Sequence, residues 1–444
     1  MPASILPRLP PRWATMTVND LLRGRTAGYR RVLSRRDFRL LWLGSSVSLV
    51  GDGMTFVALT WLVLSQPDGV RRLGLLTVCY TLPVFAGGLL SGPVLDRFDK
   101  RYVLAADSVI RGAAMASIPV MSALGEVPAA LPFVVAAVYG LFKMVPLAGF
   151  PAAIPDLVPE EDLDVANALE SLGFSLAGVA GPALGGLLIA GFGGEAVLAF
   201  DAVSFALFAA AALAVRRPLT PGAHDGTAAP GAREGAARPS GLRTLRDRAL
   251  VATTLAFMAF NVATGMLLVA GPWLAATRLP GGPQTLGLLL AALAAGELAG
   301  AALAGTGAGR RRPVRAIAVV QLAAATGFLG LLAAPHLLGV AAGYLVIGMF
   351  SAPMTIWAQS LRMARIPAPL RGRGFALLRT LMQATPPLGA AIVTPLLAAG
   401  ALAPPVLAMT LVAGVPALVL LAMTGRVRAR SRPDDHTGVR REEI

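Results

Sequence analysis

Residues 73–101 read LGLLTVCYTLPVFAGGLLSGPVLDRFDKR. The part from 73 to 95 carries no charge, and as a helix rising 1.5 Å per residue it is long enough to cross a hydrocarbon core of ~30 Å. The six residues that follow include Arg97, Lys100 and Arg101. An uncharged apolar run with a basic end predicts a membrane-spanning helix that ends at the cytoplasmic surface.

The composition of the whole chain agrees with this stretch. Hydrophobic residues make up 55% of the 444 positions and charged residues 14%, and the mean hydropathy is +0.68. Soluble domains are nearer ~25% charged. A soluble protein of this length has no core large enough to bury so much apolar side chain. We therefore expect an all-α membrane protein.

Several classes of site are excluded by composition. The single cysteine, Cys79, rules out an intramolecular disulfide, and the three histidines lie too far apart to predict a zinc site. Neither of the two lysines, Lys100 and Lys143, ends a P-loop, so ATP-driven transport would need a separate subunit. We expect no cofactor and no metal.

Apolar runs of similar length recur along the chain, separated by short polar, proline-rich or glycine-rich segments. They predict twelve spans, at residues 38–64, 73–95, 102–123, 128–151, 165–191, 195–215, 249–276, 284–305, 313–334, 336–359, 372–398 and 402–425.

The spans fall into two groups of six. We expect six-helix bundles at 38–215 and 249–425, joined by a flexible linker at 216–248 that is rich in proline, glycine and arginine. Residues 1–37 form a basic N-terminal arm, and Met16 is an alternative start. The stretch 21–39 predicts either a helix lying on the membrane surface or an unstructured basic segment. Residues 426–444 form a polar tail.

The distribution of basic residues predicts the orientation. Most of the 39 lysines and arginines fall in the arm, the linker, the tail and the loops on their side of the membrane, whereas the opposite loops hold Arg71, Arg72 and Arg278. Basic loops face the cytoplasm. We therefore expect a multi-pass plasma-membrane protein, monomeric, with both termini cytoplasmic. The same distribution explains the net charge of +15 without a nucleic-acid partner.

The two halves contain similar segments. Residues 53–62, GMTFVALTWL, match residues 265–274, GMLLVAGPWL, at six of ten positions. A second match aligns Gly92, Asp96 and Arg97 with Gly305, Gly309 and Arg310 at nearly the same offset. Chance similarity between apolar helices is the alternative to an internal duplication. Repeated halves of this kind bind substrate between them, near the membrane midplane.

The loop at residues 92–101, GPVLDRFDKR, resembles motif A of the major facilitator superfamily, with Asp99 where glycine is usual. The segment Gly181-Pro182-Ala183-Leu184-Gly185 is similar to the core of antiporter motif C, although the glycines expected upstream are Ala168 and Ala177. Residues 36–44 and 154–159 resemble the twelve-span drug–proton antiporter branch, which includes macrolide and siderophore exporters.

The resemblance implies the major facilitator fold, in which two bundles rock around a central cavity lined by spans one, four, seven and ten. It implies that the motif A residues gate the cytoplasmic side, with Asp96 at a helix N-terminus and Arg97 bridging to an acid. The alternative is a simple basic anchor. Glu170 and Arg379 would form a gate pair between the bundles. The residues that the resemblance assigns to gating are Gly92, Asp96, Arg97, Lys100, Arg101, Gly181, Pro182 and Gly185.

Charged residues inside spans are costly, so each one needs a reason. Asp52, between two glycines in the first span, is a candidate proton carrier or else a structural acid. Lys143 in the fourth span is a candidate substrate contact and ion-pair partner of Asp52, or else a lysine that snorkels along the wall. Glu297 in the eighth span is a second proton candidate, with a structural role as the alternative.

Other polar residues in the spans have less specific patterns. Asp107 and Arg111 are four residues apart and predict a structural pair within one helix, and we expect Asp201 to be structural too. Three more are candidates for substrate contact, with ordinary helix packing as the alternative: Asn261, Trp357 and Gln359.

Together these features predict a secondary transporter that exports a hydrophobic or amphiphilic compound, such as a drug, an antibiotic or a siderophore, in exchange for protons. Its partners would be the small-molecule substrate, protons and lipid. An uptake symporter is one alternative, and a receptor or lipid-handling protein without transport is another. A membrane enzyme is disfavoured, since no nucleophile–base spacing appears.

Overall fold

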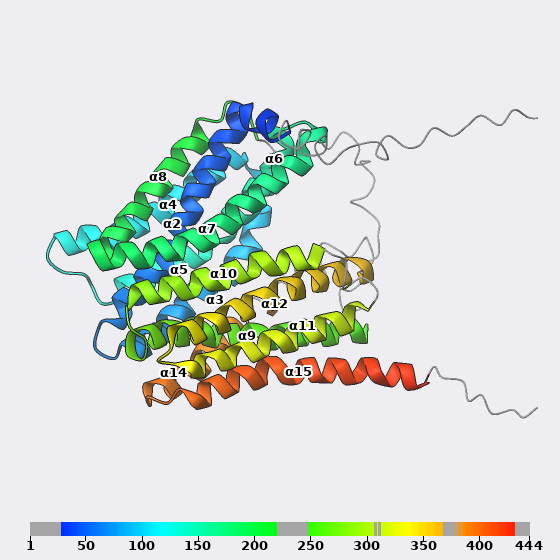
Figure 1. The fold of residues 1–444 in the computed structure, drawn as a ribbon. Helices are drawn as coiled ribbons and strands as arrows, with labels where there is room; N and C mark the ends of the chain where they lie inside the picture. The colour runs from blue at the N-terminus through cyan, green and yellow to red at the C-terminus, as the bar shows by residue number, and fades with distance from the viewer. Residues whose placement is uncertain are drawn as a thin grey trace, which may run out of the picture.

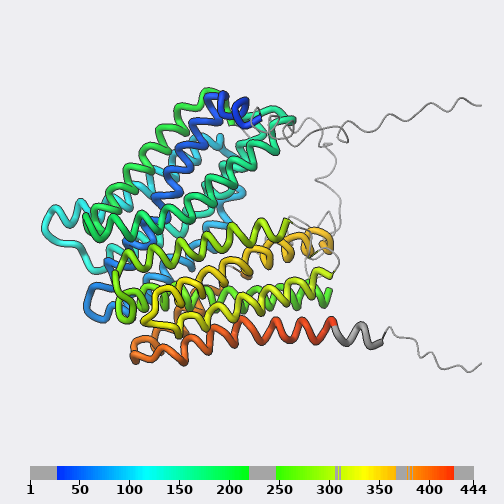
Figure 2. The backbone as a smooth tube through the Cα atoms, viewed as in Figure 1, coloured from blue at the N-terminus to red at the C-terminus, as the bar shows by residue number. Residues whose placement is uncertain are grey.

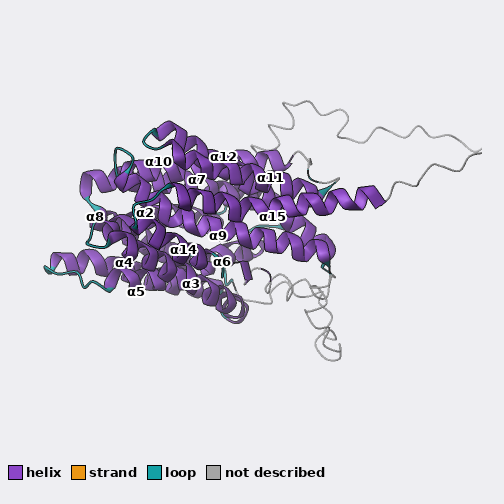
Figure 3. Ribbon diagram, turned by 90° about the horizontal axis from the view of Figure 1, so that it is seen from below, coloured by secondary structure: helices purple, strands orange, loops and turns teal. Residues whose placement is uncertain are grey.

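A computed structural model describes residues 28–219, 247–305, 309, 312–366, 378, 381–382 and 384–430. Within these ranges the chain is helical, with short connecting loops and no strand (Figure 3). The predicted all-α class is confirmed: among the described residues, eleven helices are long and apolar enough to cross a membrane. Most of the predicted linker and tail, and most of the N-terminal arm, lie outside the described residues.

The N-terminal helices follow the predicted spans closely. They are α2 (Arg36–Leu64), α3 (Gly69–Arg97), α4 (Lys100–Ala123), α5 (Leu131–Phe142), α6 (Met144–Leu157), the short η2 (Glu160–Asp162), α7 (Leu163–Phe192) and α8 (Gly194–Leu213). The fourth span consists of α5 and α6, which together cross as one apolar segment.

The C-terminal helices repeat the pattern. They are α9 (Arg248–Thr277), α10 (Pro283–Gly305), α11 (Pro313–Gly327) with η4 (Phe328–Ala333), α12 (Leu337–Arg365), α14 (Pro386–Ala398) and α15 (Ala403–Arg430). The predicted eleventh span, 372–398, is represented mainly by α14, a shorter apolar helix. Much of the first half of that span lies outside the described residues.

Figures 1 and 2 show two groups of helices, α2–α8 and α9–α15. The groups converge at one end and diverge toward the end where α2 begins and α12 ends. Glycines permit the contact at the converged end. A Cβ on Gly186 of α7 would clash with the Pro283 carbonyl oxygen of α10, and one on Gly287 would clash with the Pro182 carbonyl oxygen of α7. The backbones of the two groups therefore touch directly there.

Candidate functional site

A cavity of about 510 Å³ lies between the two groups of helices. Its walls come from α2, α3, α5, α6 and α7 on one side and from α9, α10 and α14 on the other. Apolar and aromatic side chains form most of the lining. The polar residues that line it are Asp52, Tyr80, Thr81, Tyr139, Lys143, Asn261, Thr264 and Glu297.

Lys143 reaches this cavity from a break in the fourth span. Pro146 has no N–H to donate to the carbonyl of Phe142, and its ring crowds that carbonyl, so the helix is interrupted between α5 and α6. The Lys143 Nζ donates to the Tyr80 hydroxyl at 3.1 Å and lies 4.8 Å from the centre of the Tyr80 ring. Tyr80 in turn stacks on Tyr139, with ring centroids 5.2 Å apart.

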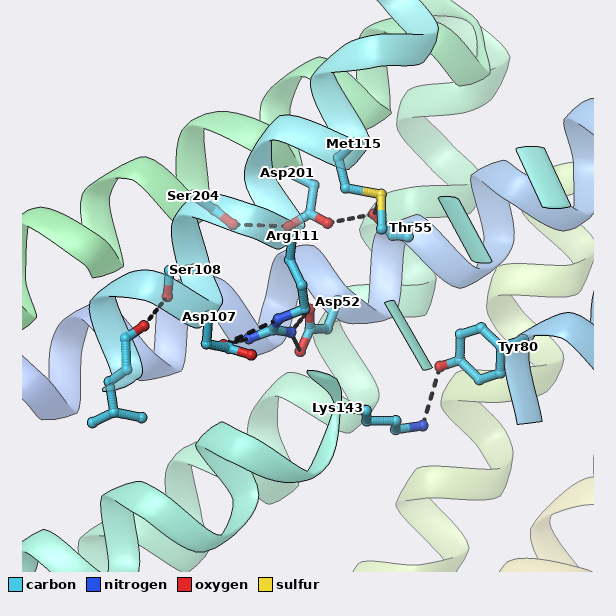
Figure 4. A network of polar contacts seen from close by, with 11 residues as sticks. Asp52, Thr55, Tyr80, Asp107, Ser108, Arg111, Met115, Lys143, Asp201 and Ser204 are labelled. Atoms are coloured by element: carbon cyan, nitrogen blue, oxygen red, sulfur yellow. Dashed lines mark hydrogen bonds and ion pairs between the residues drawn. The ribbon is translucent and has the colours of Figure 1, made fainter. Parts of the chain in front are cut away.

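Arg111 of α4 joins two carboxylates from different helices (Figure 4). Its Nη2 lies 2.6 Å from Oδ2 of Asp107, one turn earlier in α4, and its Nη1 lies 3.2 Å from Oδ1 of Asp52 in α2. The guanidinium also lies over the Phe205 ring, 4.3 Å from its centre. Arg111 is fully buried, whereas the Asp52 side chain keeps 14% of its area exposed. A buried cation therefore holds an acid that faces the cavity.

The predicted Asp52–Lys143 ion pair is wrong. Both residues line the cavity, but Asp52 pairs with Arg111 and Lys143 donates to Tyr80 (Figure 4). The predicted pair within α4, Asp107–Arg111, is confirmed, yet it is only half of the arrangement. Spacing along one helix indicates a local partner and carries no information about a second partner on another helix.

Asp201 of α8 has the structural surroundings that were expected. It is fully buried and accepts hydrogen bonds from the hydroxyls of Thr55 and Ser204. Gly51 makes room for it, because a Cβ there would lie 2.6 Å from Oγ of Ser204 and would clash with the Asp201 carboxylate. The absence of a side chain at this glycine lets α2 pack directly on α8.

The segment of α7 that resembles motif C packs against α2, on the side of α2 that does not contact α8. A Cβ on Gly53 would lie 2.8 Å from Cδ of Pro182, one on Gly181 would lie 2.9 Å from Cα of Gly53, and one on Gly185 would lie 2.8 Å from Cα of Met54. These residues therefore form the close contact of α7 with α2. Asp52, between its two glycines, is placed at the cavity by both contacts.

The remaining predicted substrate and proton residues divide into two groups. Glu297 and Asn261 line the cavity from α10 and α9, although the Asn261 amide donates to the Met382 carbonyl at 3.1 Å. Trp357 and Gln359 lie outside it: the Trp357 Nε1 points to the Ala304 carbonyl at 3.5 Å, and Gln359 is exposed. Of the four spans expected to line the cavity, the first, the fourth and the seventh do so. The tenth span, α12, contributes none of the lining residues, so that expectation is wrong, and the eighth span, α10, lines the cavity instead.

The motif A loop is arranged differently from expectation. Asp96 lies in the last turn of α3, not at a helix N-terminus. Asp99, the departure from the motif, caps α4 and accepts a hydrogen bond from the Arg101 backbone N–H at 2.9 Å. Burial raises the pKa of Asp99, but hydrogen bonds from the Arg101 side chain and backbone outweigh it and hold the pKa below its usual value. Gly92 is exposed and has open space where a Cβ would lie.

Two of the three basic residues in the motif A loop have acidic partners. Lys100 pairs with Asp156 at 3.0 Å, and Arg101 pairs with Asp99 at 2.9 Å. Arg97 is exposed beside the Phe98 ring, and no acid within the described ranges lies within ion-pair distance of it, so the expected bridge is not formed. The proposed gate pair cannot be placed: Glu170 is half-buried next to Ser171, and Arg379 lies outside the described residues.

Two tyrosines that line the cavity, Tyr80 and Tyr139, were not singled out from the sequence as site residues, and Arg111, which lies behind the cavity, was not expected to be a partner of Asp52. A signal existed for the tyrosines. The chain has only five, and a tyrosine within a span adds a hydroxyl that needs a partner when buried.

Comparison with known proteins agrees with this architecture. Residues 31–435 match the family described as transmembrane secretion effector. The chain is 30% identical over 374 residues to the multidrug efflux pump Tap of Mycolicibacterium fortuitum, covering 81% of this chain and 89% of that protein. It is 28% identical over 157 residues to the enterobactin exporter EntS of Salmonella choleraesuis, covering 35% of this chain and 38% of that protein.

Solved structures share the fold. A peptide transporter POT in complex with sulfate superposes with a TM-score of 0.74 at 14% identity, covering 88% of this chain and 95% of that one. A bacterial homologue of the human lysosomal transporter Spinster, in an inward-facing and unoccupied conformation, superposes with a TM-score of 0.63 at 14% identity. The match covers 90% of this chain and 98% of that one. The chain therefore belongs to the transmembrane secretion effector family, within the major facilitator superfamily of membrane transporters.

Proposed function

We propose that this transporter exports a hydrophobic or amphiphilic small molecule in exchange for protons, by alternating access. The observation that carries the proposal is the position of Asp52: its carboxylate faces a largely apolar cavity while Arg111 holds it from behind. A charge in a membrane span is expensive to insert, so an acid exposed to a cavity indicates a role in ion or substrate movement.

The cavity lining supports the substrate class. Phe56, Tyr80, Tyr139 and Phe174 offer aromatic surfaces, and most other lining residues are apolar. Such walls suit a hydrophobic compound held by a few polar contacts. Glu297 is a carboxylate on the opposite bundle, with no ion pair to any described residue, and it is available to a proton or to a cationic group of the substrate.

Proton exchange would act through the Asp52–Arg111 pair. When Asp52 takes up a proton it loses its charge, and its attraction to Arg111 weakens while the guanidinium keeps Asp107. Return of the proton restores the pair. A membrane potential supplies ~2.3 kcal/mol per charge for each 100 mV, enough to drive modest accumulation.

Direction rests on the relatives and on orientation. A relative that is 30% identical over 81% of this chain is named a multidrug efflux pump. The bundles diverge toward the end that carries Lys100 and Arg101, which the positive-inside rule assigns to the cytoplasm. In that orientation the cavity opens inward, ready to load a substrate for export. The same acid and cavity would also serve an uptake symporter, which would move substrate and protons in the same direction.

The test is transport in proteoliposomes with an imposed pH gradient and ethidium as the probe. We expect wild-type protein to drive ethidium against its gradient toward the acidic compartment, and Asp52→Asn to lose this coupled movement. Asp164→Asn is the control, since Asp164 is an exposed acid outside the cavity, in the first turn of α7. Movement away from the acidic compartment would favour the symporter. Undiminished coupled flux in Asp52→Asn would remove Asp52 from the mechanism.

A further inference from the structure

A second cavity of about 420 Å³ lies on the outer face of the N-terminal bundle, away from the central cavity. We call it the lateral groove. It runs between α3 and α4, and α5 and α6 form its floor. Several of its apolar side chains are exposed, as expected of a surface that faces lipid. Its lining residues are Gly87, Leu90, Ser91, Val94, Phe98, Tyr102, Val103, Ala106, Asp107, Ile110, Leu141, Phe142 and Val145.

The lateral groove contains one acid, Asp107. The residue is 2% exposed, and its Oδ2 accepts two hydrogen bonds from Arg111, at 2.6 and 3.1 Å. Its Oδ1 has no hydrogen-bond partner among the described residues. Leaving a buried carboxylate oxygen without a donor costs free energy, so this oxygen favours a donor supplied from outside the chain. Because Oδ1 is covered, a ligand reaches it only by parting the apolar side chains of the groove.

The charge balance indicates that the donor is a cation. Asp107 and Asp52 share the single guanidinium of Arg111. The other cation nearby, Lys143, lies on the cavity side of the α5–α6 wall with its ammonium on Tyr80. Within the described part of the chain Asp107 is therefore paired only by a guanidinium that it shares, and an ammonium group in the groove would restore the balance.

The dimensions of the groove indicate an amphiphile. Asp107 follows Lys100 by seven residues, which places it about 10 Å along α4 from the helix start. Phe98 and Tyr102 lie at that helix start as exposed aromatic rings, the residue types found where membrane meets water. Leu90 and Val94 line the path between. We propose that the lateral groove binds a lipophilic amine from the bilayer, with its ammonium on Asp107 and its alkyl chain along α3 and α4.

This proposal goes beyond the transport function, because it concerns a binding site separated from the central cavity by one wall of helix. Tyr139 and Lys143 face the central cavity, whereas Leu141, Phe142 and Val145 face the groove. Binding in the groove can be measured without any transport, so the two proposals fail independently.

The experiment is photolabelling of the full-length protein in lipid nanodiscs with dodecylamine that carries a diazirine on its alkyl chain. Labelled residues are mapped by mass spectrometry, with unlabelled dodecylamine and dodecanol as competitors. We expect labelling on α3 and α4 around Leu90, Val94 and Tyr102. Unlabelled dodecylamine should compete with this labelling, and dodecanol should need an at least about tenfold higher concentration to do so. The reason is that the alcohol lacks the charge that strengthens a hydrogen bond to a carboxylate.

Two variants make the result decisive. Asp107→Asn removes the charge at nearly constant shape, and the affinity for the amine should fall about tenfold or more. Ala106→Trp fills the groove from an exposed position without touching the Asp107–Arg111 pair, and should abolish the labelling. Equal competition by amine and alcohol, labelling unaffected by both variants, or labelling confined to central-cavity residues such as Phe174 would each overturn the proposal.

Discussion

Arg111 and Asp52 form an ion pair between two helices, with 3.2 Å between Nη1 and Oδ1, and the acid faces the central cavity while the arginine does not. The pair therefore connects the cavity to the interior of the N-terminal bundle. It also leaves Lys143, which faces the same cavity, with an aromatic partner in place of an acidic one.

The first prediction compares the two candidate partners of Asp52 in double-mutant cycles. Groups in direct contact show coupling energies of roughly 0.5–3 kcal/mol, and groups without contact show less. We expect Asp52→Asn and Arg111→Gln to couple within that range, and Asp52→Asn and Lys143→Gln to couple more weakly. The measurement is the free energy of unfolding in mixed micelles titrated with sodium dodecyl sulfate. Stronger coupling to Lys143 than to Arg111 would contradict the observed pairing.

A second prediction concerns Gly51. Alanine at this position places its Cβ 2.6 Å from the Ser204 Oγ and into the Asp201 carboxylate, so α2 must move away from α8. Such overpacking costs typically 1–3 kcal/mol. Thermal unfolding in detergent should show a lower midpoint for Gly51→Ala. Gly191→Ala is the matched control, because Gly191 is an exposed glycine of α7 with open space around it. Equal midpoints for the two variants would mean that the helix contact is not tight.

A third prediction follows from the cap of α4. The pKa of Asp99 is held below its usual value, so its contribution to stability is full above the unfolded pKa of ~3.9 and is lost as the pH falls through the lower folded pKa. Removing an N-cap costs typically ~1 kcal/mol. Asp99→Ala should therefore unfold more easily than wild type at pH 7, with a difference that shrinks as the pH falls below ~3.9.

The control for this cap is Asp99→Asn. Asparagine caps helices about as well as aspartate but carries no charge. It should therefore retain the cap and lose only the charge contribution from Arg101, whose Nη2 lies 2.9 Å from Oδ2 of Asp99. If Asp99→Ala were less stable than wild type by the same free energy of unfolding at every pH, the ionised carboxylate would not be the stabilising form.

The sequence predicted the helices well because lipid leaves few alternatives. A backbone in a bilayer must bond to itself, so an uncharged apolar run of sufficient length is a helix. It also identified Asp52, Lys143 and Glu297, since charges within such runs are rare. All three line the central cavity.

Partners between helices were not predictable in the same way. Whether Asp52 meets Arg111 or Lys143 depends on how each helix is rotated and how deeply α4 packs against α2, and neither follows from one helix alone. The break at Lys143 did have a local signal in Pro146, which prevents the hydrogen bond to the Phe142 carbonyl. The lateral groove had none, because it depends on the separation of α3 from α4.

The last prediction concerns the contact of α7 with α10. Gly186 meets the backbone at Pro283, and Gly287 meets the Pro182 carbonyl, so the closed end of the cavity depends on two glycines. A side chain at either position pushes the bundles apart there. Gly186→Val should therefore disfavour the observed conformation and increase the distance between the ends of α2 and α9.

That distance can be measured between spin labels by pulsed electron resonance. Exposed Gln66, just beyond α2, and exposed Thr277, the last residue of α9, are suitable sites for cysteine, in a background in which Cys79 is serine. Gly191→Val is the control, because this exposed glycine of α7 contacts nothing within 4 Å. A longer mean distance in Gly186→Val alone would support a gate formed by backbone contact. Identical distance distributions in both variants would mean that other contacts hold this end closed. The contact of Gly74 in α3 with Thr394 in α14 would then be the next to test, because a Cβ on Gly74 would clash with the Thr394 side chain.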